Sequence, residues 1–349
     1  ILEFTSPLLT SWQPIWSVPG RNLADDDSSW QLVMIPIKQL QYLQKGFQFR
    51  FRNYATTSGN LDHWHIDYVY LNKFRTNADT IFEDVTFVYN TPSLLNTYSA
   101  MPWKHYDSSY MKTDYFTTSR NNFNIQKYGS FRYNIYDATG IQVHTYNGGS
   151  DNINPFYTSG YDTVVAFVNP PLAPFTIPIL TDTTHYTMES ILSTNPDKQK
   201  ENDTIHHRQV FHNYYAYDDG TAETQFGLST LNAQMAVKYE SPIGDTLRCI
   251  DIYFNPVLTD ASIYAFELNV WEDAGGIPGT SIYITDSIML PEYAQTGYDK
   301  FTHYYLDPPL YVPAGVFYIG FTQKTTQFLN VGVDRNINTQ DKIFYNVAG

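Results

Sequence analysis

The stretch Phe47–Leu71, FQFRFRNYATTSGNLDHWHIDYVYL, decides the fold that we expect for this chain. It begins with strict alternation, in which every second residue from 47 to 51 is phenylalanine and the residues between and after them are glutamine or arginine. Because successive side chains of a strand point to opposite faces, this pattern predicts a half-buried strand with phenylalanines inward and guanidinium groups outward. The turn-rich run Asn53–Asp62 then reverses the chain.

A second strand is predicted after this turn. It carries two apolar pairs, 64/66 and 69/71, which are out of phase by one residue. If all four side chains face the same core, the register must shift at Asp67–Tyr68, and a β-bulge there is the simplest solution. We therefore predict that one core buries the apolar residues of this hairpin, which are Phe47, Phe49, Phe51, Trp64, Ile66, Val69 and Leu71.

The hairpin resembles the closing hairpin of MAM-like and laminin-G-like jelly rolls, where an Arg-bearing aromatic strand and a loop precede Asp-x-Trp-x-Ile-Asp and an apolar pair. The matching positions here are Asp62, Trp64, Ile66, Asp67, Val69 and Leu71. Such domains usually carry Asp-Asp where this chain has Asp67–Tyr68, which weakens the case for that family's calcium site. The phrases RFRNYATTSGNLDHWHIDYVYL (50–71) and YAYDDGTAETQFGL (215–228) are similar to large exported bacterial proteins that use type IX secretion.

The strand pattern and this resemblance predict an all-β chain of three tandem sandwiches. Residues 1–75 would be the C-terminal part of a jelly roll, which needs about eight strands in all. Residues 76–214 have short alternating strands without a Cys–Trp–Cys signature, and this favours an immunoglobulin-like sandwich. Residues 215–349 would form a second jelly-roll-like domain. The chain begins without Met inside an expected strand, so we expect an interior fragment of a longer precursor.

Composition excludes several function classes. The formal net charge of −14 opposes binding to a phosphate backbone or to anionic lipid. The single cysteine, Cys249, permits no internal disulfide, and we expect it to be a small buried hydrophobe. No run approaches the ~20 apolar residues of a membrane-spanning helix.

Four groups of side chains could hold a metal ion. His63, His65 and Asp67 would share one face of an uninterrupted strand, but the expected bulge would rotate the carboxylate away. The histidines at 206, 207 and 212 form a looser group, which a solvated strand explains as well. The carboxylates of Asp218, Asp219 and Glu223 are weak calcium candidates, because an Asp-Asp-Gly turn needs no ion. The acidic run Asn22–Ser29 offers a similar choice between calcium and a solvated turn. We predict neither a catalytic metal nor a cofactor.

No catalytic motif supports an enzyme. The chain lacks Gly-x-Ser-x-Gly and His-Glu-x-x-His, and a glycosidase pair cannot be chosen from 35 acidic residues without geometry. The aromatic content of 17% is compatible with sugar stacking, with protein interfaces or with aromatic cores.

We expect a non-catalytic, exported protein on the periplasmic or cell-surface side of the outer membrane, which binds another envelope protein. The resemblance implies an accessory or plugging subunit of the type IX translocon barrel. The alternative is a carbohydrate-binding or adhesin module. The loops at Asn22–Ser29, Asn53–Asp62 and Asn195–Asp203 are the longest polar ones that would flank a binding surface.

Overall fold

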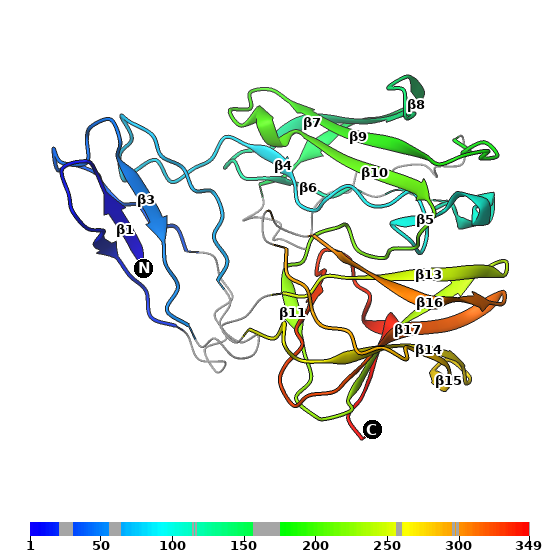
Figure 1. The fold of residues 1–349 in the computed structure, drawn as a ribbon. Coiled ribbons are helices and arrows are strands. Elements are labelled where there is room, and N and C mark those ends of the chain that lie inside the picture. The colour runs from blue at the N-terminus through cyan, green and yellow to red at the C-terminus, as the bar shows by residue number, and fades with distance from the viewer. Residues whose placement is uncertain are drawn as a thin grey trace. The chain divides into compact units, whose positions relative to one another are not determined.

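A computed structural model describes residues 1–20, 31–55, 64–113, 115, 117–155, 175–255, 260–294, 297 and 300–348. In these residues the regular structure is β-strand, apart from four short 3-10 turns at Trp103–His105, Ser108–Tyr110, Lys200–Asn202 and Gln340–Lys342. The predicted all-β chain of tandem sandwiches is confirmed. The chain divides into two compact units, Ile1–Thr80 and Ile81–Gly349, which Figure 1 shows as a blue part and a cyan-to-red part.

The first unit contains one antiparallel sheet in the order β2-β1-β3, formed by β1 (Leu2–Thr5), β2 (Gln13–Trp16) and β3 (Gln48–Phe51). One face of the central strand is apolar: Leu2 and Phe4 are buried and pack with Tyr42. The Phe4 ring lies edge-on to Tyr42 and to Phe47, with centroid distances of 5.4 and 5.0 Å. The strand predicted from the alternating phenylalanines is therefore present as β3.

The predicted burial of the hairpin is wrong. Residues 64–71 form no strand, so no β-bulge exists at Asp67–Tyr68. Tyr68 instead has a positive φ of 49°, and its N–H donates to the Asp67 carboxylate at 2.8 Å. β3 is thus an edge strand, since no described strand pairs with its outer side. Phe47 is half-buried, and the other predicted core residues are exposed, namely Phe49, Phe51, Trp64, Ile66, Val69 and Leu71. Asp62 lies outside the described residues.

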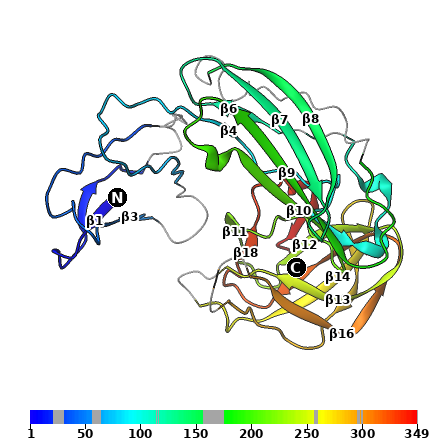
Figure 2. The ribbon, with the colours of Figure 1, turned by 90° about the horizontal axis from the view of Figure 1, so that it is seen from above.

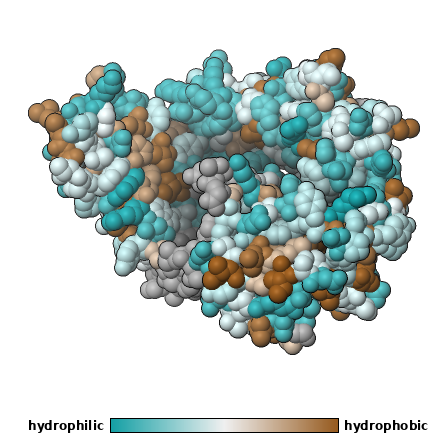
Figure 3. Space-filling view, viewed as in Figure 1, coloured by the Kyte–Doolittle hydropathy of each residue, from teal (hydrophilic) through white to brown (hydrophobic). Residues whose placement is uncertain are grey.

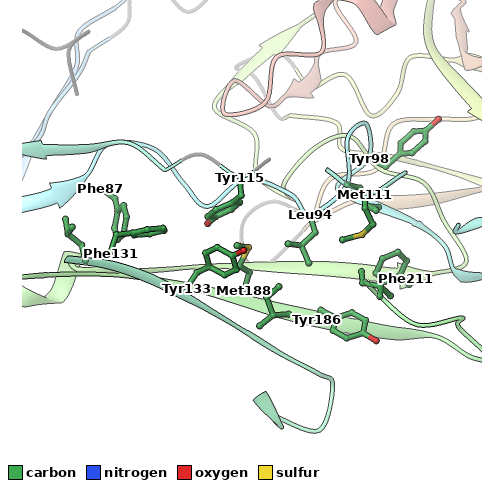
Figure 4. Close-up of a cluster of buried hydrophobic side chains, with 14 of the residues drawn as sticks. Phe87, Leu94, Tyr98, Met111, Tyr115, Phe131, Tyr133, Tyr186, Met188 and Phe211 are labelled. Carbon is green, nitrogen blue, oxygen red and sulfur yellow. The ribbon is translucent and has the colours of Figure 1, made fainter. Parts of the chain in front are cut away.

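The second unit begins with a five-stranded sheet in the order β5-β10-β9-β7-β8, and a strand pair, β4-β6, lies across from it. Alternation along β7 sends Phe131, Tyr133 and Ile135 into the core. Figure 4 shows Tyr115 facing Tyr133 across this core. A turn at Asp137–Gly140, closed by the Gly140 N–H donating to the Asp137 carbonyl, joins β7 to β8. The strands are β4 (Val85–Phe87), β5 (Ala100–Pro102), β6 (Ser119–Asn121), β7 (Lys127–Tyr136), β8 (Gln142–Ile153), β9 (Thr184–Thr194) and β10 (Thr204–His212).

A second sandwich follows in the same unit. A five-stranded sheet, β15-β14-β17-β12-β19, packs against the pair β13-β16, and between them lies a second core that includes Phe266, Tyr304 and Phe321. The strands are β11 (Thr224–Phe226), β12 (Gln234–Ser241), β13 (Asp245–Ile252), β14 (Phe266–Asp273), β15 (Pro278–Ile284), β16 (Thr302–Val312), β17 (Gly315–Gln323), β18 (Val331–Val333) and β19 (Ile343–Asn346).

Tyrosines join the two sandwiches. Tyr98 is 2% exposed; its hydroxyl donates to the Glu240 carbonyl at 2.9 Å and accepts from the Glu240 N–H at 3.0 Å. The rings of Tyr215 and Tyr217 lie 4.7 and 5.0 Å from the Tyr98 ring. Tyr239 packs against both hydrophobic cores. The predicted division at 214/215 falls at this junction and remains a prediction.

We expect Tyr98→Phe to lower the free energy of unfolding of the second unit by about 2 kcal/mol, because it removes two hydrogen bonds to the Glu240 backbone, each worth about 1 kcal/mol. Urea unfolding at neutral pH measures the loss. Tyr128→Phe is the control, since this side chain is 66% exposed. Equal stability of the two variants would contradict the role that we assign to the Tyr98 hydroxyl.

Candidate functional site

The first unit exposes many large apolar side chains in its described residues. Its described core contains three buried side chains. Seven large side chains between residues 49 and 71 are 37–59% exposed, and we call them the 49–71 apolar surface: Phe49, Phe51, Trp64, Ile66, Val69, Tyr70 and Leu71. Figure 3 shows brown, apolar residues at the surface of this unit. Large exposed apolar patches on soluble proteins usually mark interaction sites.

The backbone of β3 adds a second feature to this surface. β3 pairs with β1 on one side, from Leu2↔Phe51 to Thr5↔Gln48. No strand within the described ranges pairs with its other side. An unpaired strand edge offers a row of N–H and C=O groups to which another chain can add a strand.

The opposite face of this sheet carries charged side chains that form ion pairs. Glu3 is 4% exposed, and its two carboxylate oxygens meet the guanidinium groups of Arg50 at 2.7 Å and Arg52 at 3.1 Å. The Arg50 guanidinium also lies 4.3 Å from the centre of the Trp12 ring. The arginines thus point to the face opposite the phenylalanines, as predicted. Because they compensate Glu3, they do not provide the unpaired charge that often protects an edge strand.

The structure brings together two of the three predicted calcium candidates. Asp219 and Glu223 lie with Asp334 in one group whose ligand atoms are all within 4.8 Å of one another. The third candidate, Asp218, instead accepts a hydrogen bond from the Gly220 N–H at 3.1 Å. The Asn336 amide donates to Asp219 and Glu223 at 2.9 and 3.2 Å, so hydrogen bonds already satisfy part of this group. No signal local to residues 218–223 indicates that Asp334 joins them.

The predicted histidine groups are dispersed. His63 lies outside the described residues, so the trio with His65 and Asp67 stays untested. On β10, His206 is exposed and lies 3.4 Å from the Glu189 carboxylate, whereas His207 points inward. Burial lowers the pKa of His207 to about 4. The prediction of a solvent-exposed strand position is therefore right for His206 and wrong for His207.

Cys249 is half-buried and not a core residue, which corrects the sequence prediction. The register between β13 and β16 shifts between Leu247 and Cys249, where one residue of β13 stands against four of β16 (306–309), and beyond this shift Cys249 lies on the outer face of the pair. There its thiol lies 3.2 Å from Asp251 Oδ1, and His303 Nδ1 lies 2.7 Å from the same oxygen.

One group at the junction has the composition of a Ser–His–Asp triad. His105 Nδ1 lies 3.2 Å from Ser241 Oγ, and its Nε2 lies 3.1 Å from Asp245. However, Ser241 is 5% exposed and donates to the Ile243 carbonyl at 2.7 Å. The Tyr215 hydroxyl also contacts the same Nδ1 at 2.7 Å. Burial lowers the pKa of His105, although Asp245 acts in the opposite direction. A neutral, enclosed imidazole stabilises the junction and leaves no accessible nucleophile here.

A surface pocket of about 580 Å³ lies between the turns at 103–108 and residues 176–180. Trp103 lines it, as a sugar-stacking residue would. The Lys104 ammonium lies 5.4 Å from the centre of this indole ring, so one face of the ring is already occupied.

Comparison with known proteins assigns no relative. No protein-family model matches the chain, and neither a curated protein nor a solved structure matches it. In the part of the chain that the structure describes, no helix is long and apolar enough to cross a bilayer.

We expect His207 to make the second unit acid-sensitive. Its folded pKa of about 4 lies below its ordinary value of 6.5, so the unfolded state binds a proton first as the pH falls. Stability present above pH 6.5 is therefore lost between pH 6.5 and 4, by about 2 kcal/mol at pH 5. Urea unfolding at pH 7.5 and 5 should show this loss in the native protein and not in His207→Gln. His206→Gln is the control; an unchanged pH dependence in His207→Gln would contradict the assignment.

Proposed function

We propose that this chain is a non-catalytic interaction protein, which binds a protein partner through the 49–71 apolar surface and the free edge of β3. The observation that carries the proposal is the combination of exposed apolar side chains with a strand edge that no described strand pairs, in a unit whose described residues include three buried core side chains. Burial of apolar side chains by a partner is favourable at roughly 25 cal/mol per Å². An added strand would also satisfy the free backbone groups of β3.

The composition of this surface favours a protein over a glycan. Sugar-binding surfaces use aromatic rings, on which pyranose rings stack. Here Ile66, Val69 and Leu71 are aliphatic and at least 46% exposed. Aliphatic side chains cannot stack on a sugar ring, but they pack well in protein interfaces. Trp64 and Tyr70 belong to the residue types that most often dominate binding energy in such interfaces.

The resemblance described in the sequence analysis supplies the class of partner. It supports an exported protein of the bacterial envelope that serves as an accessory or plugging subunit of the type IX translocon. The net charge of −14 fits this proposal, because it disfavours nucleic acid and anionic lipid as alternative partners. A stable interface of this kind buries about 1,600 Å² in total.

Site-specific photo-crosslinking in the native cell tests the proposal. A photoreactive phenylalanine analogue at Val69 or Phe51 should give one discrete adduct with a protein of the envelope. The same analogue at Ile141, which is 64% exposed in the second unit, serves as the control. If the partner is the translocon, the protein should co-purify with it, and its deletion should leave the unoccupied channel leaky.

Val69→Asp and Leu71→Asp should weaken this association by tenfold or more, since each places a charge in an apolar contact. Both side chains are more than half exposed, so neither change should affect folding. Ile141→Asp should have no effect. Two results would overturn the proposal. One is an identical crosslinked adduct at Val69, Phe51 and Ile141. The other is polysaccharide binding that Trp64→Ala abolishes, which would favour the glycan alternative.

A further inference from the structure

The outer face of the pair β13-β16 carries three metal-ligating side chains that the proposed function does not use. Figures 1 and 2 show these two strands side by side at the surface of the second unit. Their inner face is apolar: Ile250, Ile252, Tyr304 and Leu306 are all at most 9% exposed. The residues that alternate with them point outward, and these include Cys249, Asp251 and His303.

The ladder register fixes the spacing of this group. Asp251 lies directly opposite His303, and Cys249 is two residues before Asp251 on the same face. Directly opposite residues of an antiparallel pair have Cβ atoms about 5 Å apart, which suits two ligands of one ion. Sγ, a carboxylate oxygen and an imidazole nitrogen all lie within 4.8 Å of one another. The contacts that define the group are 3.2 Å from Sγ to Asp251 Oδ1 and 2.7 Å from His303 Nδ1 to the same oxygen.

The order of these contacts argues against a nucleophilic cysteine. In a Cys–His pair the imidazole takes the thiol proton, whereas here the carboxylate lies between the thiol and the imidazole. Burial and the adjacent carboxylate raise the pKa of the Cys249 thiol to about 12. A divalent cation reverses this preference, because a coordinated thiol loses its proton to solvent and the carboxylate becomes a second anionic ligand.

The ligand types select the ion. A thiolate and an imidazole are ligands for zinc, whereas calcium and magnesium prefer oxygen ligands alone. Zinc with three protein ligands keeps a fourth position for water or another group. Cys249 is half-buried, and Asp251 and His303 have side chains 42% and 62% exposed, so solvent reaches this position.

We propose that Cys249, Asp251 and His303 form an open three-ligand site for Zn²⁺ on the outer face of β13 and β16. The site is independent of the 49–71 apolar surface, which belongs to the other unit. It also differs from the Asp219/Glu223/Asp334 group, whose ligand atoms are all carboxylate oxygens.

Cobalt titration of the reduced, metal-free protein tests this site, with Co²⁺ as a spectroscopic substitute for Zn²⁺. We expect one equivalent of Co²⁺ to produce a sulfur-to-metal charge-transfer band in the near ultraviolet, which one equivalent of Zn²⁺ then removes. Cys249→Ser should abolish the band. His303→Asn should weaken Zn²⁺ binding by about a hundredfold or more, since even loss of an outer-shell partner costs 10–100-fold.

The chain offers a matched control in the pair His206 and Glu189. These residues are also directly opposite each other on neighbouring strands, and their side chains are 3.4 Å apart, but no cysteine is part of the group. His206→Asn should therefore leave the band and the Zn²⁺ affinity unchanged. Circular dichroism verifies that each variant is folded. Absence of the band in the folded native protein would overturn the proposal, as would equal Zn²⁺ affinity of the native protein and Cys249→Ser.

Discussion

The hydroxyl of Tyr98 is the contact on which the arrangement of the second unit depends. It lies between two sandwiches and satisfies both the N–H and the C=O of one residue, Glu240. These two hydrogen bonds favour the observed arrangement of the two sandwiches. The surrounding rings include Tyr239, which packs against both cores. The two cores belong to one compact unit.

The described residues of the first unit include no such junction. Their exposed apolar side chains explain both the wrong prediction of burial and the proposed function. Alternation and hydrophobicity correctly place β3, but they cannot show whether a neighbouring strand covers it. Residues 64–71 do not pair with β3, so side chains suited to a core remain at the surface. Small sheets of three short strands bury little area, and here the enclosed Glu3 with its two arginines supplements the apolar face. A partner that covers the remaining apolar residues would bury the side chains that this unit leaves exposed.

The sequence predicts the second unit well wherever the signal is local. Alternating strands and the turn residues at 137–140 are read from neighbouring residues, and the structure confirms them, whereas the turn after β14 is already followed by β15 at Pro278. The candidate sites depend on pairings across long sequence separations. Asp334 joins Asp219 from 115 residues away, and His303 faces Asp251 from 52 residues away. Periodicity gives the face on which a side chain lies but not the register of its partner strand, so such groups require the structure.

Cys249 shows how a single irregularity converts a core position into a surface position. Leu247 and Cys249 are two residues apart, so an uninterrupted strand would place both on the same inward face. The register shift between them, opposite residues 306–309 of β16, changes the phase: Leu247 still packs against the core, and Ile250 and Ile252 now point inward. Burial of two isoleucines is worth several kcal/mol, which offsets the lost ladder bond. The same shift turns Cys249 and Asp251 outward, opposite Tyr305 and His303. The hydrophobic demand of the core thus determines which polar groups meet on the outer face.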